Sequence, residues 1–322
     1  MFSRFYTIAA NTFLETIRQP IFGVVLFAAA LLMIFNIGLA GFTLEDDDKL
    51  LLDLGLSTLL LSGLFLSVFS ATGVLTREIE NKTILTLVSK PVSRPVLIAG
   101  KYAGLLAALG VAFYLCFLVF LLTMRHKVLQ RSTDPWDMPV IVFGFGGLAL
   151  ALGVAAFCNY FYDLEFSSTA LALAVPLLTL AVLLTGFWDK TWNRQEYGMG
   201  IFSVDLFIAA YLVLLAVMVL AAVALAASTR LSQVLTLLVC VLVTAVGLVS
   251  DFALGQYQEE SLIARVAYQA LPNLGIFWVI DAVNSGIPVP SQYLVLATGY
   301  SVVLVIALLM IGVALFQRRE VG

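Results

Sequence analysis

The sequence predicts an all-α protein that crosses a membrane about eight times. Of its 322 residues, 62% are hydrophobic and only 11% are charged, whereas soluble domains carry roughly 25% charged residues. Several uncharged apolar runs reach about 20 residues, the length that crosses the hydrocarbon core as a helix. These runs do not alternate in polarity as the strands of a membrane barrel do, so helices are the expected form.

The predicted spans share a complete absence of Asp, Glu, Lys, Arg and His. They are Ile21–Gly41, Leu54–Leu75, Tyr102–Met124, Pro139–Cys158, Ser168–Trp188, Leu206–Ala227, Leu231–Ser250 and Gln292–Phe316. The chain's 3 cysteines lie in or at the ends of these runs and form no CxxC pair. We interpret them as packing residues rather than as metal ligands or a disulfide framework.

The segment before the first span, residues 1–20, predicts an amphipathic helix lying on the membrane surface. Its apolar side recurs at helical spacing and consists of Phe2, Tyr6, Ala9, Phe13 and Ile17, and its polar side consists of Arg4, Asn11, Glu15 and Arg18. Pro20 separates this helix from the first span. The alternative is a frayed tail near the membrane. We therefore divide the chain into an interfacial helix, 1–20, and a single transmembrane domain, 21–322.

A charged insert over residues 77–101, REIENKTILTLVSKPVSRPVLIAGK, separates the second run from the third. It holds five of the 17 Lys and Arg residues, so the positive-inside rule places it in the cytoplasm. Ile84, Leu87 and Val88 fall on one face of a short helix. Pro91 ends this helix, because the residue before a proline disfavours the α region. Ser93 can cap the helix that follows. The insert exceeds what a turn requires and predicts a structured knob.

Eight spans with this insert inside place both termini in the cytoplasm. Ten Lys and Arg residues then lie inside and seven outside, a modest bias in the expected direction. The four Trp residues fall on or near the outer side, as an interfacial aromatic belt does. The loop Arg125–Asp137 stands against this orientation because it places three cations outside. We expect the single histidine, His126, to be a solvated surface residue of that loop.

Two further segments lie outside in this topology. The loop Phe42–Asp53 carries an acidic run, and we expect a solvated turn rather than a cation site, since all-oxygen sites need several positioned ligands. The outer segment, 251–291, contains the apolar stretch Leu271–Ala282. That stretch is too short to cross and is typical of an interfacial or re-entrant helix. A lid over the outer ends of the spans is the alternative.

The sequence lacks the residue patterns of catalysis. It contains no GxxxxGK[ST] phosphate loop, no HExxH and no CxxC, and one histidine supports no catalytic triad. We therefore predict no catalytic residue, no metal site and no nucleic-acid partner. An ion-coupled carrier usually places ionisable residues near the membrane midplane. Because the predicted spans hold none, we expect energy to arrive from outside the membrane, through the insert.

The insert resembles the coupling segment of type-2 ABC transporter permeases. The matching residues are Glu78 and Glu80, Lys82-Thr83-Ile84, Ser89-Lys90-Pro91-Val92-Ser93-Arg94 and Gly100-Lys101. Asn11-Thr12-Phe13 with Arg18 is similar to the family's connecting helix, Phe316–Glu320 resembles its cytoplasmic end, and Pro272-Asn273 with Asp281-Ala282 resembles its outer segment. The family core has six spans, so we assign Pro139–Cys158 and Ser168–Trp188 as an added pair.

The resemblance implies a permease subunit of an ATP-driven system, with export as the expected direction, in a bacterial inner membrane. It implies a separate cytoplasmic ATPase that carries ATP and Mg²⁺, no cofactor in this chain, and a second permease subunit. The expected ATPase-coupling residues are Glu78, Glu80, Thr83, Ile84, Leu87, Val88, Pro91 and Arg94, and the expected interfacial residues are Phe2, Tyr6, Phe13, Ile17 and Arg18. A self-contained secondary carrier and a non-transporting scaffold are the alternatives. Apolar spans without polar anchors do not choose among drugs, lipids, polysaccharides and ions.

Overall fold

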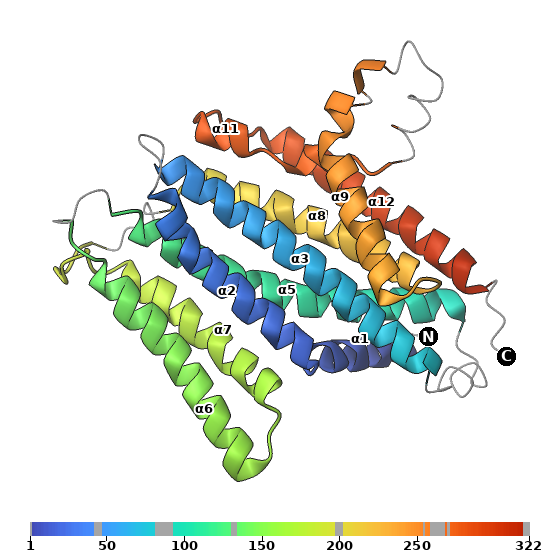
Figure 1. Cartoon of the computed structure of the whole chain (residues 1–322), viewed down its shortest axis with the longest axis horizontal. Helices are drawn as coiled ribbons and strands as arrows, with labels where there is room; N and C mark the ends of the chain where they lie inside the picture. The colour runs from blue at the N-terminus through green and yellow to red at the C-terminus, as the bar shows by residue number, and fades with distance from the viewer. Residues whose placement is uncertain are drawn as a thin grey trace. The chain divides into compact units, whose positions relative to one another are not determined.

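The computed structural model describes residues 2–41, 47–80, 93–129, 134–196, 202–253, 255–257, 268 and 271–317, without the side chains of 2 and 75–80. These residues form helices and loops, with no β-strand among them, which confirms the all-α prediction (Figure 1). Within the same ranges, eight helices are long and apolar enough to cross a membrane. The eight-span prediction is therefore confirmed.

The structure defines the following elements in chain order. They are α1 (Phe2–Ile17), α2 (Pro20–Ala40), α3 (Asp47–Glu80), α5 (Arg94–His126), the π-helix η1 (Val140–Phe145), α6 (Gly146–Tyr162), α7 (Phe166–Thr185), α8 (Val204–Ser228), α9 (Gln233–Ala253), the 3₁₀-helices η3 (Gly255–Tyr257) and η4 (Gly275–Phe277), α11 (Ile280–Asn284) and α12 (Ser291–Gln317).

One loop prediction is wrong. We expected a solvated turn over Phe42–Asp53, but Asp47–Asp53 form the first turns of α3, while residues 42–46 lie outside the described residues. Carboxylates are favoured in the first turn of a helix because they face the positive end of its dipole. Asp48 also pairs with Lys127, with 2.8 Å between Oδ2 and Nζ.

The chain divides into two compact units, which we describe separately. Unit 1 comprises Met1–Thr16, Gly63–Leu109 and Tyr211–Gly322, and unit 2 comprises Ile17–Ser62 and Gly110–Ala210. Four helices, α1, α3, α5 and α8, contribute residues to both units, α1 through Ile17 alone. The division into an interfacial helix and one transmembrane domain stays a prediction.

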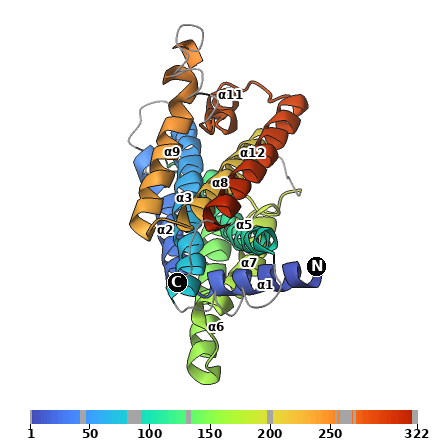
Figure 2. The same ribbon diagram turned by 90° about the vertical axis from the view of Figure 1, so that its right-hand side faces the viewer.

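In unit 1, α1 packs on α5 through two glycines one helical turn apart. Figure 2 shows α1 crossing the first turns of α5. A Cβ on Gly100 would lie 2.9 Å from Cγ2 of Ile8, and a Cβ on Gly104 would lie 2.7 Å from Cβ of Thr12 and closer still to the Ala9 carbonyl oxygen. This small-xxx-small spacing lets two helix backbones approach closely in a membrane. The helical part of the interfacial prediction is confirmed by α1.

The predicted interfacial residues differ in exposure: Tyr6 and Arg18 are more than half exposed, whereas Ile17 is buried. Tyr6 is 73% exposed, whereas Thr12 and Thr16 are buried. An apolar side chain exposed on a membrane-surface helix faces lipid rather than water. The membrane-surface roles of Phe2, Tyr6, Phe13, Ile17 and Arg18 stay a prediction.

The outer segment of unit 1 forms the short helices η4 and α11 rather than one continuous helix. Its apolar side chains Leu274, Phe277 and Ile280 are buried. The Leu274 amide donates to the Gly247 carbonyl oxygen at 2.9 Å, which fixes the segment on α9. Packing against α9 therefore accounts for an apolar stretch too short to span.

Polar contacts secure the same segment. Nδ2 of Asn273 donates to the Asp251 carboxylate at 2.8 Å, and the Asn273 amide donates to the Tyr300 hydroxyl at 2.9 Å. The Tyr268 hydroxyl also donates to Asp251, at 2.6 Å. This hydrogen bond raises the pKa of Tyr268, because losing the proton would remove the bond and set two negative charges side by side.

Unit 2 is organised at one end by a buried arginine. Nε of Arg125, at the end of α5, lies 3.1 Å from Oδ2 of Asp137, and both residues are at most 7% exposed. The same guanidinium donates to the backbone carbonyl oxygens of Thr185 and, at 2.6 Å, Trp188. Asp137 also accepts the Val140 amide at 3.1 Å, which caps the start of η1. One cation thus joins α5, η1 and the end of α7.

The prediction for the single histidine is wrong. His126 belongs to α5 rather than to a solvated loop, and it is 6% exposed. Its ring meets that of Trp136 edge-on, with 5.8 Å between centroids, and Nδ1 lies 2.9 Å from the Lys127 carbonyl oxygen. The helix continues past the uncharged run because Arg125 finds its partners in tertiary contacts that a sequence pattern does not show.

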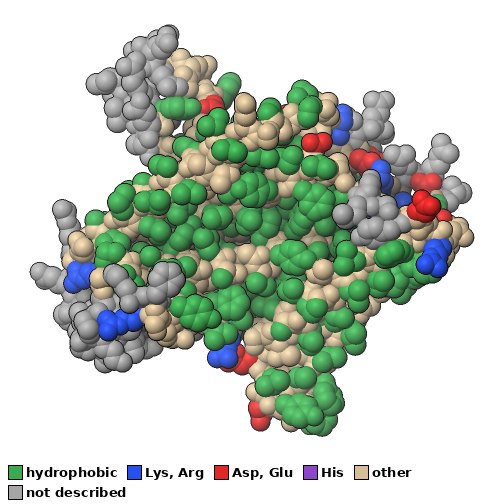
Figure 3. All heavy atoms as spheres, turned by 180° about the vertical axis from the view of Figure 1, so that it is seen from behind, with side chains coloured by type: hydrophobic (Ala, Val, Ile, Leu, Met, Phe, Trp, Pro, Cys, Tyr) green, Lys and Arg blue, Asp and Glu red, His purple; other side chains and the backbone are tan. Residues whose placement is uncertain are grey.

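The opposite end of unit 2 carries an aromatic cluster at the tip of the α6–α7 hairpin. Phe157, Tyr160, Phe161 and Tyr162 are all more than half exposed, and the rings of Phe157 and Phe161 lie 4.4 Å apart. Figure 3 shows hydrophobic side chains gathered at this tip. Tyr side chains of this kind are enriched where membrane spans meet the lipid headgroups.

Removing the charge of Asp137 tests how much the buried ion pair with Arg125 stabilises the fold. Asp137→Asn keeps an oxygen for the Val140 amide but leaves Arg125 uncompensated, so we expect a loss of about 3–5 kcal/mol. The measurement is the apparent melting temperature of the purified chain in detergent. Asp48→Asn is the control, because that ion pair is more than half exposed and costs about 0–1 kcal/mol when removed. Equal melting shifts for the two variants would contradict the buried role.

A second prediction concerns the seat of α1. Gly104→Leu places a side chain where Thr12 and the Ala9 backbone already lie, so we expect α1 to leave α5. Protease cleavage within residues 1–20 should then become faster, because a displaced helix exposes its backbone. Gly299→Leu is the control in the same unit, since a Cβ there meets nothing within 4 Å. Unchanged cleavage in Gly104→Leu would show that α1 is held elsewhere.

Candidate functional site

The predicted coupling segment, residues 77–101, begins in the last turn of α3 and ends in the first turns of α5. Its middle, residues 81–92, falls outside the described residues. The predicted coupling residues that the structure does not describe are Thr83, Ile84, Leu87, Val88 and Pro91. Glu78 and Glu80 belong to the last turn of α3, although their side chains are also outside the description. Of the predicted coupling residues, Arg94 therefore has described contacts. The roles of the whole set stay a prediction.

Arg94 is the first residue of α5 and lies within the predicted coupling segment. Its Nη1 donates to the Gln317 carbonyl oxygen at 2.9 Å, and its guanidinium lies 6.0 Å from the centroid of the Phe316 ring. The last carbonyl groups of a helix have no partner within the helix and carry partial negative charge, so a cation is favoured there. Arg94 thus ties the start of α5 to the end of α12.

Helix α5 begins as the sequence indicated, with the Leu97 amide bonded to the Ser93 carbonyl oxygen at 3.1 Å. It therefore starts two turns before the predicted span Tyr102–Met124 and carries Lys101 inside the protein. Lys101 is 2% exposed, and its Nζ donates to the Val74 carbonyl oxygen of α3 at 3.4 Å. Because a buried ammonium group must find oxygen partners, this residue links α5 to α3.

Two further contacts complete what we call the α5 hub, defined as Arg94, Gly100, Lys101, Tyr102 and Gly104. The Tyr102 hydroxyl donates to the Met218 carbonyl oxygen of α8 at 2.9 Å. Gly100 and Gly104 seat α1. The α5 hub thus contacts α1, α3, α8 and α12, all within unit 1.

The end of α12 is held from a second direction. Nε of Arg230, in the turn between α8 and α9, donates to the Leu315 carbonyl oxygen at 2.9 Å. The sequence pattern pointed to Arg94 but not to Tyr102 or Arg230. Both of these bond to backbone carbonyl groups far away in the chain, and such contacts leave no motif. The sequence marks Tyr102 and Arg230 in one way, because each stands at the end of an apolar run.

The contacts of the α5 hub are contacts between helices. In the part of the chain that the structure describes, no group of three or more His, Cys, Asp or Glu residues could hold a metal ion. The α5 hub joins one short stretch of helix to four others. Within this stretch, Arg94 contacts α12, and Lys101 and Tyr102 contact α3 and α8.

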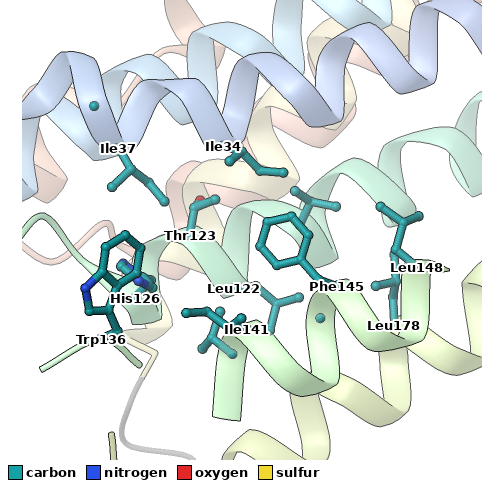
Figure 4. Close-up of a pocket in the computed structure, with 14 residues that line it drawn as sticks. Ile34, Ile37, Leu122, Thr123, His126, Trp136, Ile141, Phe145, Leu148 and Leu178 are labelled. Carbon is teal, nitrogen blue, oxygen red and sulfur yellow. The ribbon is translucent and has the colours of Figure 1, made fainter. Parts of the chain in front are cut away.

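Unit 2 contains two apolar cavities of about 470 and 540 Å³ among α2, α5, η1, α6 and α7. Figure 4 shows the first, with Ile34 and Ile37 of α2 facing Phe145 across it and with His126 and Trp136 side by side at one end. Thr123 is one of few polar residues in its wall, and the Thr123 hydroxyl is already bonded to the Phe120 carbonyl oxygen at 2.8 Å.

Comparison with known proteins identifies the family. No curated protein matches the chain at a significant level. A family model described as ABC-2 family transporter protein matches residues 50–233, which is more than half of the chain. The matched range contains the coupling segment and also α6 and α7, the pair that we assigned as an addition. The resemblance drawn from the insert is thereby confirmed, and the chain belongs to the ABC-2 family of transporter membrane proteins.

Proposed function

We propose that this chain is the permease subunit of an ATP-driven exporter and that a separate cytoplasmic ATPase docks on residues 77–101. The family match supports a membrane component of an ABC transporter that is not itself catalytic. ATP and Mg²⁺ then belong to the partner. The observation that carries the coupling role is the α5 hub, because it joins the end of the proposed docking segment to four helices at once.

The docking contact we propose is a helix in a groove. Ile84, Leu87 and Val88 share one face of a short predicted helix and would enter an apolar groove on the ATPase. Glu78, Glu80 and Arg94 would supply charges at the rim, which steer and orient partners more than they add affinity. When two ATPase subunits close on ATP, the segment moves and Arg94 carries that movement to α12. A second permease subunit, identical or related, would complete the path.

We further propose that both termini and the coupling segment are cytoplasmic, in a bacterial inner membrane. Three ion pairs of unit 2 support the underlying arrangement of spans: Arg18–Glu165, Lys127–Asp48 and Arg125–Asp137. Each joins two residues that the predicted topology puts on the same side of the membrane. The pairs also account for the cations of the Arg125–Asp137 loop that stood against the orientation, since Arg125 and Lys127 each meet a carboxylate.

The docking proposal predicts that Leu87→Asp separates the chain from its ATPase. A carboxylate cannot enter an apolar groove without losing its hydration, and a central contact of this kind is worth roughly 2 kcal/mol or more, so affinity should fall at least about 30-fold. The measurement is recovery of the ATPase with the tagged chain from native membranes, alongside the melting temperature of the chain.

Leu164→Asp is the matched control, since Leu164 is 49% exposed in the α6–α7 turn on the same predicted side. Its ATPase recovery should equal that of the native chain. Full ATPase recovery by Leu87→Asp, with normal transport, would remove the docking segment from the mechanism. Transport by the purified chain driven by an ion gradient without nucleotide would instead establish a self-contained carrier, and partner binding without any flux a scaffold.

The topology predicts opposite labelling of two loops. In a chain with Cys116, Cys158 and Cys240 replaced by alanine, Glu196→Cys should react with a membrane-impermeant maleimide added to intact spheroplasts. Ser232→Cys, in the exposed turn between α8 and α9, should react after the membrane is opened. The charge distribution sets this direction. The reverse pattern would invert the chain and place the coupling segment outside.

A further inference from the structure

We propose that a groove along unit 2 binds acyl chains of zwitterionic phospholipids from the bilayer, a role beyond that of coupling to an ATPase. The two cavities of about 470 and 540 Å³ share Val119, Leu148 and Leu178 in their walls. The two cavities therefore adjoin, and we treat them together as one groove, which we call the chain groove. Its walls come from α2, α5, η1, α6 and α7, together with Trp136.

The chain groove has a closed floor and an open side. Cys116, Leu122 and Leu178 line it and are at most 6% exposed, whereas Phe27 and Phe145 line it and are 56% and 52% exposed. Buried residues below and exposed apolar residues at the rim describe a furrow open to the side of the helices. On a membrane-spanning unit, that side faces the bilayer.

The length of the chain groove matches the hydrocarbon core. Along α2 its wall runs from Pro20 to Gly38, which is about 27 Å at the helical rise of 1.5 Å per residue. The hydrocarbon core is about 30 Å thick. The cavity near Pro20 therefore lies in one leaflet and the cavity near Gly38 in the other. Each has the place and the shape for one acyl chain.

The wall chemistry selects hydrocarbon. Water occupies a cavity where it finds two to four polar partners, and the Thr123 hydroxyl in the wall is already bonded within its own helix. Space left empty would deprive the lining atoms of dispersion contacts on one side. An acyl chain from the surrounding bilayer supplies those contacts and leaves no polar group buried.

The charged residues at the two ends of the chain groove indicate which kind of lipid headgroup fits there. Arg18 and Glu165 pair at 3.0 Å beside the groove-lining residues Pro20 and Phe166, and both side chains are 53% exposed. At the other end, Lys127 and Asp48 pair at 2.8 Å beside the groove-lining residue His126. Their side chains are 56% and 57% exposed. Nζ of Lys190 also donates to the His126 carbonyl oxygen at this second end, at 3.1 Å, so each end presents charges of both signs. This arrangement complements a headgroup carrying both a phosphate and an ammonium group rather than an anionic one.

Photolabelling from within the bilayer tests the proposal. The full chain is placed in vesicles of phosphatidylethanolamine and phosphatidylglycerol with a trace of phosphatidylethanolamine that carries a diazirine in mid-chain, and the labelled residues are mapped by mass spectrometry. Phe27 and Phe145 should be labelled several-fold more than Leu31 and Leu180. All four are 50–56% exposed, but the last two lie outside the groove walls.

A matched pair of substitutions tests whether the acyl chain occupies the volume of the chain groove. A Cβ on Gly38 meets nothing within 4 Å although Gly38 lines the groove, so Gly38→Leu fills it without a clash. Labelling of Phe145 should then fall about fivefold or more, because the chain and the new side chain compete for one volume. Gly153→Leu, equally free of neighbours but outside the walls, should leave the labelling unchanged.

Three results would overturn the proposal. Equal labelling of groove and matched residues would mean ordinary contact with the bilayer. Protection of Phe27 and Phe145 together with a crosslink to a second copy would mean that a partner helix fills the groove. Stronger labelling by a phosphatidylglycerol probe would exclude the zwitterionic headgroup. None of these results depends on an ATPase, so the docking proposal stands or falls separately.

Discussion

The constraint on which both units depend is that a cation inside this apolar chain must be met by oxygen atoms. Arg125 meets a carboxylate and two carbonyl groups, and it thereby fixes where α5, η1 and α7 end relative to one another. In unit 1, Arg94, Lys101 and Arg230 donate to carbonyl oxygens of α12 and α3. Lipid offers no such partners, so each cation specifies a helix contact that purely apolar packing would leave free to slide.

The same constraint explains what the sequence predicted and what it did not. The eight spans followed from the length of their uncharged runs, and each has its counterpart in a helix. Both ends of α3 and the far end of α5 lie beyond the predicted runs, because an uncharged run stops at the first charged residue, whereas a helix continues as long as that residue is compensated. Asp47 and His126 lie in such continuations. Arg125, beside His126, bonds to the carbonyl groups of Thr185 and Trp188, 60 and 63 residues away, and such partners leave no trace in local pattern.

The candidate site was predictable in a different way. Arg94 and the residues before it were recognised as part of a family pattern, and the family match supports that recognition. The physical content of the site came from the structure, because the hydroxyl of Tyr102 and the two glycines under α1 matter through what they touch. A glycine in an apolar run looks the same in sequence whether it seats a helix, as Gly104 does, or faces open space, as Gly153 does.

In the π-helix η1, the number of residues in one turn matters as much to the structure as the identity of their side chains. Six residues, Val140–Phe145, occupy this wide turn before α6 continues as a normal helix, and such a turn amounts to one inserted residue. A deletion of a single residue there would remove the wide turn and leave the rest of the helix in its present register, because the wide turn already absorbs the extra residue. Leu148 and Leu152, which line the chain groove together with residues of α2 and α7, would keep their places. The same deletion one turn later, within α6, would instead rotate every following side chain of that helix by about 100°.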